Sequence, residues 1–333
     1  MSVLVTGGAG YIGSHTCVEL LNAGYDIVVL DNFSNSKPEV LDNIRKITNK
    51  NFKFYKADLL DYETTEKVFK ENEIDEVIHF AGSKAVGEST EKPVDYYHNN
   101  ITGTIKLLQL MKKYNCFRLV FSSSATVYGI PKEPAISEDF DLKPENPYGR
   151  TKLYIEMMLK DLCASDKRYA VSLLRYFNPI GAHSSALLGD DPNGIPNNLM
   201  PYISRVAANV LDILPVYGND YATHDGTGIR DYIHVVDLSI GHLAALKQLR
   251  TTVGVQIYNL GTGTGYSVLD VVNAFEKANN IKISYKFMPR RGGDIDEYFS
   301  NPKKANTELL WKAEKSITDM CADSWNFTKN RYK

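Results

Sequence analysis

The chain has 333 residues, of which 43% are apolar and 23% charged, which is ordinary for a globular protein and leaves room for two domains. Its 38 basic residues are balanced by 40 acidic ones, and this argues against nucleic-acid binding through bulk charge and against an acidic disordered tail. No apolar run approaches the ~20 residues of a membrane-spanning helix, and the first residues lack the basic start of a signal peptide.

Cysteine and histidine spacing bears on redox compartment and metal binding. The four cysteines, at positions 17, 116, 163 and 321, are far apart and form no CxxC pair. This spacing predicts reduced thiols in a cytoplasmic protein. The seven histidines form no HxxxH or HxH pair, so we expect no metal site, and His79 and His234 are interpreted as packed or hydrogen-bonded residues.

Short β-branched runs alternate with helical patterns through the first half of the chain. Their near-continuous apolarity suits strands buried on both faces of a parallel sheet, and their spacing fits strand–helix–strand units. A first helix is expected to end before Gly24, which takes the left-handed position, and another is expected to start with Asn146 as N-cap and Pro147 in its first turn. The expected strands are 3–6, 26–30, 52–56, 76–80, 117–122 and 169–176, and the expected helices include 11–23 and 92–113.

The character of the sequence changes after about residue 178. Segments 189–196 and 217–228 are rich in Gly, Asp, Asn and Pro, which predicts long functional loops. Further strands are expected at 257–260 and 281–287, and a helix at 268–278. We therefore predict an α/β protein with a doubly wound parallel sheet in residues 1–177, to which the chain returns near 230–262, and a smaller mixed α/β domain over 178–333.

A glycine-rich turn, GxxGxxG, follows the first expected strand with Gly7, Gly10 and Gly13. In a Rossmann-type fold such glycines allow a tight turn, close approach of a pyrophosphate, and close packing of helix on strand. The helix that follows presents free N–H groups and a partial positive charge to the phosphates. Because the motif lies between a strand and a helix, it predicts a dinucleotide site.

Asp31 ends the second expected strand, 18 residues after Gly13. A carboxylate there can accept both hydroxyls of an adenosine ribose and would repel a 2′-phosphate, so it favours NAD over NADP. The alternative is a loop aspartate that caps residues 33–37. Asp58 is a candidate to contact the adenine amino group, and the alternative is that it is a solvated loop acid. Small residues at the end of the fourth strand suit a cofactor lying close to the backbone: Phe80, Ala81 and Gly82.

Tyr148 and Lys152 lie four residues apart and share one face of the helix that starts at Pro147. A nearby ammonium and a positive nicotinamide ring both favour phenolate, and bringing a phenol pKa from ~10 to ~7 needs about 4 kcal/mol. Ser124, at the end of the fifth strand, can hydrogen-bond the reacting oxygen. An exposed Tyr and Lys on an amphipathic helix is the alternative for this pair alone. The glycine turn, Asp31 and the serine at the strand end favour a catalytic role for Tyr148 and Lys152.

Five segments together resemble the extended short-chain dehydrogenase/reductases, and the resemblance covers essentially the whole chain. The segments are VLVTGGAGYIGSH at 3–15, SSSATVYG at 122–129, LRYFNP at 174–179, GIPNNLMP at 194–201 and GIRDYIH at 228–234. The resemblance implies epimerisation at carbon 4 of a UDP-hexose, interconverting UDP-galactose and UDP-glucose through a transient 4-keto sugar with NADH still bound. It also implies tightly bound NAD, a place in galactose metabolism, and a homodimer formed through helices of the first domain.

Rival functions on the same fold are a nucleotide-sugar 4,6-dehydratase and a simple NAD dehydrogenase, and a non-catalytic NAD-binding sensor represents another class. A dehydratase needs an extra acid beside its catalytic serine or threonine, but Ser124 is followed by Ala125, Thr126 and Val127. A sensor would have no need of Tyr148 and Lys152.

The resemblance also implies roles for individual residues. Tyr148 would be the acid/base, Ser124 its partner at the sugar 4-oxygen, and Lys152 the group that holds the nicotinamide ribose and depresses the pKa of the tyrosine. The implied NAD site comprises Gly7, Gly10, Tyr11, Ile12, Gly13, Asp31, Asn32, Asp58, Leu59, Phe80, Ala81, Gly82, Lys84, Asn99, Ser122, Tyr148, Lys152, Tyr176 and Phe177. The implied substrate site comprises Ser124, Tyr148, Asn178, Asn197, Asn198, Leu199, Val216, Tyr217, Arg230, Arg291, Asp294 and Tyr298.

Within the implied substrate site, Arg230, Arg291 and Asp294 would hold the diphosphate and its ribose. A guanidinium suits this role because its planar fork binds phosphate oxygens bidentately. The alternative for the Arg290–Arg291 pair is a solvated basic patch. Tyr298 would lie beside the hexose 2-position and exclude an N-acetyl group, or would be a buried aromatic with no such role.

Overall fold

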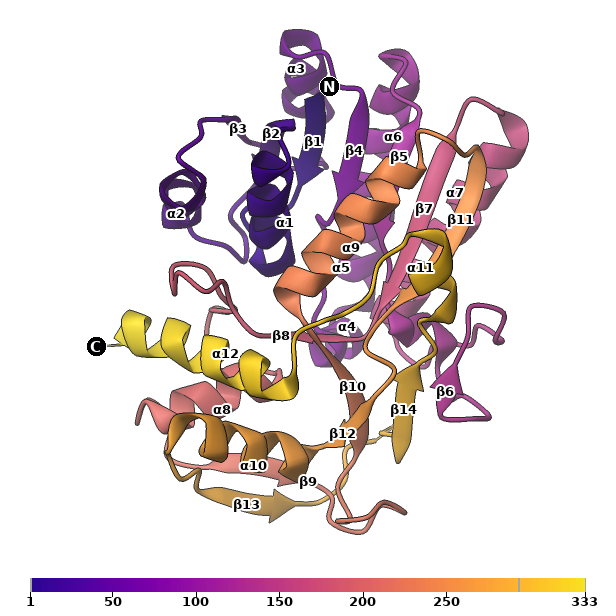
Figure 1. Cartoon of the computed structure of the whole chain (residues 1–333). Coiled ribbons are helices and arrows are strands. Elements are labelled where there is room, and N and C mark those ends of the chain that lie inside the picture. The colour runs from indigo at the N-terminus through magenta and orange to yellow at the C-terminus, as the bar shows by residue number, and fades with distance from the viewer. Residues whose placement is uncertain (1, 293, 333) are drawn as a thin grey trace.

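The computed structural model describes residues 2–292 and 294–332. The larger part of the molecule is built around a seven-stranded sheet (Figure 1). All its neighbouring strands pair in parallel, in the order β11-β7-β5-β4-β1-β2-β3. This confirms the predicted doubly wound sheet. Its strands are β1 (Ser2–Thr6), β2 (Asp26–Asp31), β3 (Lys53–Lys56), β4 (Glu76–His79), β5 (Arg118–Ser122), β7 (Ala170–Tyr176) and β11 (Gly254–Leu260).

Helices cover both faces of this sheet and bury two separate apolar cores. Because side chains alternate along a strand, Val3 and Val5 of β1 face one core while Leu4 faces the other. The first core is closed by α1 (Tyr11–Asn22), α2 (Glu39–Thr48) and α9 (Val235–Gln248). The second is closed by α3 (Tyr62–Glu71), α6 (Gly103–Lys113) and α7 (Pro147–Ser165).

A second sheet lies beyond the carboxyl ends of the first (Figure 1). Its strands are β6 (Ala135–Ile136), β8 (Asn178–Ile180), β10 (Ile229–His234), β12 (Gly265–Ser267) and β14 (Glu297–Ser300). A parallel pair, β9 (Leu214–Tyr217) and β13 (Tyr285–Met288), packs beside it with α8 (Leu199–Ala207), α10 (Val268–Asn279) and α12 (Ile317–Tyr332) around a third core. Shorter helices are α4 (Val86–Glu91), α5 (Pro93–Tyr97) and α11 (Lys303–Glu308).

The chain crosses between the two sheets in both directions. β11 returns from the second half and pairs along its whole length with β7. In the other direction, β6 leaves the first half and pairs with β14. Residues on the two sheets are therefore tied together close to the carboxyl ends of β5 and β7.

Local capping signals were predicted correctly. Asn146 Oδ1 accepts from the Gly149 N–H at 2.8 Å and starts α7, with Pro147 in the first turn. Gly24, with φ of +85°, follows α1 in the left-handed conformation. The four cysteines are buried free thiols. Among the described residues, no helix combines the length and apolarity needed to cross a membrane.

Two expected elements differ in the structure. The helix expected over 92–113 is divided into α5, a π turn over His98–Thr102, and α6. The strand expected over 281–287 begins only at Tyr285. Its first residues bond to the preceding helix instead, because Glu276 accepts from the Ile283 N–H through its side chain and from the Ile281 N–H through its carbonyl.

Candidate active site

The predicted site residues of the first half gather at the carboxyl ends of the parallel strands. Gly7 follows β1, Asp31 ends β2, Phe80 follows β4, Ser122 ends β5 and Phe177 follows β7. Ligands of open parallel sheets bind at this edge. The structure thus brings together residues that are up to 170 positions apart in the sequence, because every strand runs in the same direction.

The glycine turn forms a cradle in which side chains have no room. Gly7 has φ of +69°, and a Cβ there would lie 2.7 Å from the Ala81 nitrogen. A Cβ on Gly13 would lie 2.2 Å from the Gly7 carbonyl oxygen. The helix that follows begins at Tyr11 with no side-chain cap and no acid in its first turn, so its N–H groups are available to an anion.

Asp31 links the glycine turn to the loop after β2. Its carboxylate accepts from the Ala9 N–H at 3.0 Å and from the Phe33 N–H and the Ser36 hydroxyl at 2.8 Å. In the chain alone, the capping role considered for this residue is therefore present. Asn32 donates to Asp58 at 2.8 Å, which places this second acid beside Asp31, and Leu59 is buried next to it.

The segment after β4 lies against the π turn between α5 and α6. Asn99 in that turn donates to the Ser83 hydroxyl at 3.2 Å, and the neighbouring Asn100 accepts from the Ser83 N–H. Lys84 is exposed, and a Cβ on Gly82 would lie 3.1 Å from Asn100 Oδ1. A π turn is an irregularity often found at functional sites, and here it turns Asn99 toward the strand end.

The residues predicted to be catalytic are Ser124, Tyr148 and Lys152. All three are nearly buried, with exposed fractions of 7%, 6% and 8%. Lys152 Nζ donates to the Ser122 carbonyl at 2.8 Å and lies 5.8 Å from the centre of the Tyr148 ring. Ser124 Oγ accepts from the Thr126 N–H and from the Thr126 hydroxyl. Because both lone pairs of Ser124 are thus occupied, its own hydrogen is left to donate to a reacting oxygen.

The expected acidification of the Tyr148 phenol depends on a bound nicotinamide ring as well as on Lys152, and it stays a prediction. Burial is the largest influence and raises the pKa of Tyr148 well above its usual value, with Tyr176 adding to the rise and the Ser124 hydroxyl opposing it. Burial also lowers the pKa of Lys152 to about 8, and Glu156 opposes this. The sequence placed a cation near the phenol but did not show how completely both groups leave water.

Beside Tyr298, two arginines share one carboxylate: Arg230 lies on β10, and Arg291 and Asp294 lie between β13 and β14. Arg230 lies 3.5 Å from Asp294, and Arg291 donates to the same carboxylate at 2.9 Å. Arg230 is paired with Tyr298 across β10 and β14, and its guanidinium lies 4.9 Å from the centre of that ring. The Tyr298 ring also packs on Phe177, with centroids 5.6 Å apart, and so lies next to the end of β7.

The other predicted substrate residues surround this cluster less closely. Arg291 lies over the Tyr217 ring at 5.0 Å, and Val216 is buried on the same strand, β9. Asn178 begins β8 and is in register with Tyr232 of β10. Asn197 and Asn198 are exposed at the start of α8, and Leu199 is its first residue. Among the described residues, no hydrogen bond or ion pair joins residues 197–199 to Arg230 or Arg291, although α8 packs against β9.

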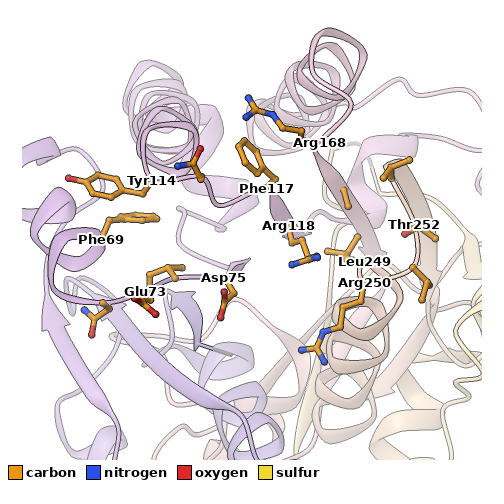
Figure 2. Close-up of a pocket in the computed structure, with 16 residues that line it drawn as sticks. Phe69, Glu73, Asp75, Tyr114, Phe117, Arg118, Arg168, Leu249, Arg250 and Thr252 are labelled. Atoms are coloured by element: carbon orange, nitrogen blue, oxygen red, sulfur yellow. The ribbon is translucent and has the colours of Figure 1, made fainter.

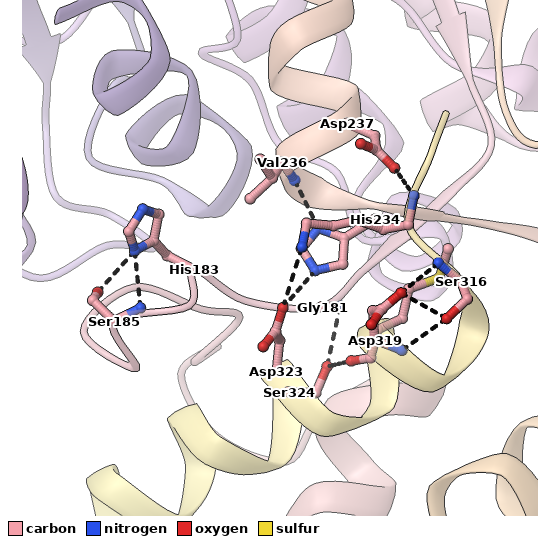
Figure 3. Close-up of polar contacts among 12 residues, drawn as sticks. Gly181, His183, Ser185, His234, Val236, Asp237, Ser316, Asp319, Asp323 and Ser324 are labelled. Carbon is pink, nitrogen blue, oxygen red and sulfur yellow. Dashed lines mark hydrogen bonds and ion pairs between the residues drawn. The ribbon is translucent and has the colours of Figure 1, made fainter. Parts of the chain in front are cut away.

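Tyr11 connects the glycine turn to the C-terminal helix. Its hydroxyl donates to the Gly181 carbonyl at 2.7 Å, and the Gly181 N–H donates to Ser324 of α12. Figure 3 shows α12 presenting Ser324 to Gly181 and Asp323 to His234. A Cβ on Gly181 would lie 2.7 Å from the His234 ring, so only glycine fits there. His234 is thus a hydrogen-bonded packing residue, as predicted.

Two other features lie away from this site. His224, Asp225 and Asp270 approach one another, but Asp225 accepts from Thr227 and Ser267, and Asp270 caps α10, so local structure accounts for these acids. A hollow of about 660 Å³ lies at the amino ends of β4, β5 and β7, the opposite edge of the sheet (Figure 2). Two of its arginines, Arg168 and Arg250, are already paired with Asp166 and Glu76.

The fold and the site define the class of protein. A parallel sheet with an uncapped glycine turn, an acid at the end of β2 and a buried serine, tyrosine and lysine at the carboxyl edge is typical of a dinucleotide-dependent short-chain dehydrogenase/reductase. Beside the second sheet, two arginines meet at one carboxylate, and guanidinium groups of this kind bind the oxygens of anions.

Comparisons with known proteins specify the family further. A family model described as GDP-mannose 4,6 dehydratase matches residues 4–324. UDP-glucose 4-epimerase from Bacillus subtilis is 59% identical, with 100% of this chain and 99% of the relative covered. The crystal structure of UDP-glucose 4-epimerase from Bifidobacterium longum in complex with NAD+ and UDP has a TM-score of 0.97 at 53% identity, covering 100% of this chain and 99% of that one.

A UDP-Glc/GlcNAc 4-epimerase from Campylobacter jejuni is also similar, with a TM-score of 0.86 at 35% identity and 99% of each chain covered. The chain belongs to the UDP-glucose 4-epimerase family of extended short-chain dehydrogenase/reductases.

The sequence reasoning missed two residues behind the site. Glu156 and Arg175 form a fully buried ion pair next to Ser123. Glu156 follows Lys152 by four residues, so Tyr148, Lys152 and Glu156 are stacked along one face of α7. A second charged residue four positions after Lys152, on a helix face that packs against the core, is the sequence signal that could have revealed Glu156.

Proposed function

We propose that this chain epimerises carbon 4 of UDP-hexoses and interconverts UDP-galactose and UDP-glucose with NAD as its resident cofactor. One observation carries the proposal: Ser124, Tyr148 and Lys152 lie buried at the carboxyl edge of the nucleotide-binding sheet, and Arg230 is linked to the same edge because Tyr298 contacts both it and Phe177. Full-length similarity to UDP-glucose 4-epimerases supports it.

The residues present fit NAD. The glycine cradle and the uncapped start of α1 suit a pyrophosphate, and Asp31 suits an adenosine ribose without a 2′-phosphate. Asn32, Asp58 and Leu59 would line the adenine end, and Lys84, Asn99, Lys152 and Tyr176 would line the nicotinamide end. When bound, NAD supplies the acceptor and then the donor of the hydrogen at sugar carbon 4.

The chain's own residues handle the proton and the nucleotide. Tyr148 takes the proton of the sugar 4-hydroxyl and later returns it, and Ser124 donates a hydrogen bond to the same oxygen. Lys152 places a positive charge beside the phenol while the phenol lacks its proton. Arg230 and Arg291 would exchange Asp294 for diphosphate oxygens. The nucleotide is thereby held firmly, and the hexose is gripped loosely enough for the 4-keto sugar to turn over.

We also propose that residues 1–177, together with the chain that returns near 230–262, hold NAD, and that 178–333 hold the UDP-sugar. The pairing of β11 with β7 and the packing of α9 on α1 support the first part of this division. The position of Arg230, Arg291 and Tyr298 around β10 and β14 supports the second. β6 is an exception, because it comes from the first half of the chain but pairs with β14.

The arrangement of acids disfavours a 4,6-dehydratase. Elimination of water needs a free acid beside Ser124, and the next residues are Ala125, Thr126 and Val127. The carboxylate of Glu156 is close in the fold, but it is fully buried and bonded to Ser123 and Arg175. The Glu156 carboxylate is therefore not placed to reach a substrate.

An assay without added NAD tests the function. Purified protein incubated with UDP-galactose is expected to form UDP-glucose, because the oxidant remains bound through the cycle. Deuterium at carbon 4 of the substrate is expected to remain in the product. Release of that label into solvent, accumulation of a 4-keto-6-deoxy sugar, or absence of turnover even with added NAD would each contradict the proposal, and the last would favour a sensor.

Tyr298 is expected to restrict the sugar 2-position. Its ring is held between Phe177 and the Arg230 guanidinium, so it cannot swing away to admit an N-acetyl group. We expect wild-type turnover of UDP-N-acetylgalactosamine to be at least ~10-fold below that of UDP-galactose, and Tyr298→Ser to narrow this ratio by ~10-fold. The ratio is measured by supplying both sugars together to one enzyme preparation and following the turnover of each. Equal wild-type rates on both would rule out this role.

We propose that the protein is a homodimer joined through α5, α6 and α7, the helices at 92–113 and from Pro147. Large apolar side chains are exposed along this layer: Val94, Ile105, Tyr154 and Met157. Tyr97 of α5 stacks on Tyr154 of α7, so the two helices present one continuous surface. Such a surface suits a twofold interface. In sedimentation experiments the wild type should be a dimer, and the double variant Tyr154→Glu, Met157→Glu should be a monomer. A monomeric wild type would refute the proposed dimer.

A further inference from the structure

A fully buried network of charges and hydroxyls lies directly behind the catalytic serine segment. Glu156 of α7 and Arg175 of β7 have exposed fractions of 0% and 1%. Their contact is bidentate, with Arg175 Nε to Glu156 Oε1 at 3.0 Å and a second guanidinium nitrogen to Oε2 at 2.6 Å. The Ser123 hydroxyl donates to Glu156 Oε1 at 2.6 Å.

The same network reaches the second sheet. Arg175 also donates to the Tyr128 hydroxyl at 3.0 Å and to the Glu138 carbonyl at 3.1 Å. Tyr128 donates to Asn259 Oδ1 at 2.6 Å, and Asn259 in turn donates to the Ile136 carbonyl of β6. Since β6 pairs with β14, the network connects α7, the end of β5 and the strand that carries Tyr298.

Stability alone does not account for this pair. Two charges removed from water cost several kcal/mol each, and well-packed apolar residues of similar volume often serve a fold as well or better. What the pair does supply is direction, because a bidentate guanidinium–carboxylate contact fixes both partners in one plane. Here it fixes Ser123, whose neighbour is Ser124, relative to the helix that carries Tyr148 and Lys152.

We propose that Glu156 and Arg175 are a positioning pair for the epimerase reaction, holding the Ser123–Ser124 segment against α7 so that Ser124 and Tyr148 meet the same sugar oxygen. This inference rests on the proposed function. Displacement of a reacting group by about 1 Å can cost ~10²-fold in rate, so a rigid link between the two catalytic hydroxyls has a large effect on turnover.

The charge of Glu156 also acts on Lys152, one helical turn away. Burial lowers the pKa of Lys152, and the Glu156 carboxylate raises it, which keeps more of the lysine protonated near neutral pH. Glu156 therefore supports both members of the Tyr148–Lys152 pair, the tyrosine through Ser123 and Ser124 and the lysine through its charge.

Glu156→Gln in the NAD-loaded enzyme tests the pair, and Glu76→Gln is its matched control. Glu76 is equally buried and has a bidentate contact with Arg250, but it lies at the amino end of β4, far from the reacting groups. We expect Glu156→Gln to lower kcat for UDP-galactose by ~10²-fold with KM within ~2-fold, and to increase the carbon-4 deuterium isotope effect on kcat. Glu156→Asp should recover at least a tenth of the activity.

The control separates positioning from folding. Glu76→Gln is expected to lower the unfolding temperature while kcat and the isotope effect stay at the wild-type values. If both variants lose activity only in proportion to their folded fraction, with an unchanged isotope effect, the positioning role is overturned. Wild-type turnover of UDP-galactose is measured alongside, so failure of the pair is distinguishable from failure of the proposed function.

Ser123→Ala provides a second test that leaves the ion pair in place. It removes one hydroxyl from a well-packed site, so the variant should fold, and kcat is expected to fall by ~10-fold with KM within ~2-fold. A wild-type kcat for Ser123→Ala would overturn the link between Glu156 and the catalytic serine, even if Glu156→Gln does not fold.

Discussion

Replacing Tyr148 with phenylalanine is expected to lower kcat for UDP-galactose by about 10³–10⁴-fold, the upper range of general acid–base catalysis. The phenol is the group that exchanges the proton of the 4-hydroxyl, and phenylalanine has no such group. Ser124 cannot replace it, because its two lone pairs already accept from Thr126 and it can only donate. Steady-state turnover with the NAD content of each preparation measures the effect.

A second buried tyrosine supplies the control for this variant. Tyr169 is 1% exposed, and its hydroxyl finds no hydrogen-bond partner among the described residues. Because a buried hydroxyl without a partner is unfavourable, Tyr169→Phe should retain full activity and unfold no more easily than the wild type. A Tyr148→Phe enzyme that kept more than a tenth of its activity would show that another group moves the proton.

The parallel sheet and the glycine turn were predictable because their signals are local. Strands buried on both faces need continuous apolar runs, as in Ile27–Leu30, and a tight turn with no room for a Cβ needs glycine at Gly7 and Gly13. The N-cap at Asn146 and the left-handed Gly24 follow from side-chain chemistry within a few residues. Each of these features is decided by neighbours in the sequence.

Features decided by distant contacts were not predictable in this way. The π turn at 98–102 is held by Asn100, which bonds to Ser83 and to Thr151 of α7. The late start of the strand expected from residue 281 depends on the Glu276 side chain. Periodicity carries no information about such partners, and it therefore predicted one long helix and one long strand.

The site shows the same limit. The spacing of Tyr148 and Lys152 indicated one helical face, but their degree of burial depends on the elements that pack on α7, which include α4, α5 and β7. In the protein without NAD, burial is the largest influence on both pKa values: it raises that of Tyr148 and lowers that of Lys152. The pairing of Arg230 and Arg291 with a single carboxylate, Asp294, is likewise a product of the fold.

Lys152→Met is expected to lower kcat by about 10²–10³-fold and at the same time to stabilise the folded protein by about 2 kcal/mol at pH 7. Burial lowers the pKa of Lys152 from 10.5 to about 8, so the folded chain carries a disfavoured cation that costs on the order of 3 kcal/mol. Loss of the hydrogen bond to the Ser122 carbonyl offsets about 1 kcal/mol of the gain.

The pH dependence of this stabilisation identifies its cause. Between pH 8 and 10.5 the unfolded chain binds a proton at Lys152 that the folded chain has lost, so wild-type stability increases with pH through this window. The advantage of Lys152→Met is therefore complete below pH 8 and shrinks toward pH 10.5. Urea unfolding of the NAD-free protein at pH 7 and pH 10 measures both values, with Lys160→Met on the exposed side of α7 as the control. The prediction amounts to a trade-off, in which the Lys152 cation supports catalysis but lowers the stability of the fold. If Lys152→Met were less stable than the wild type at pH 7, the cation would stabilise the fold, and this trade-off would be contradicted.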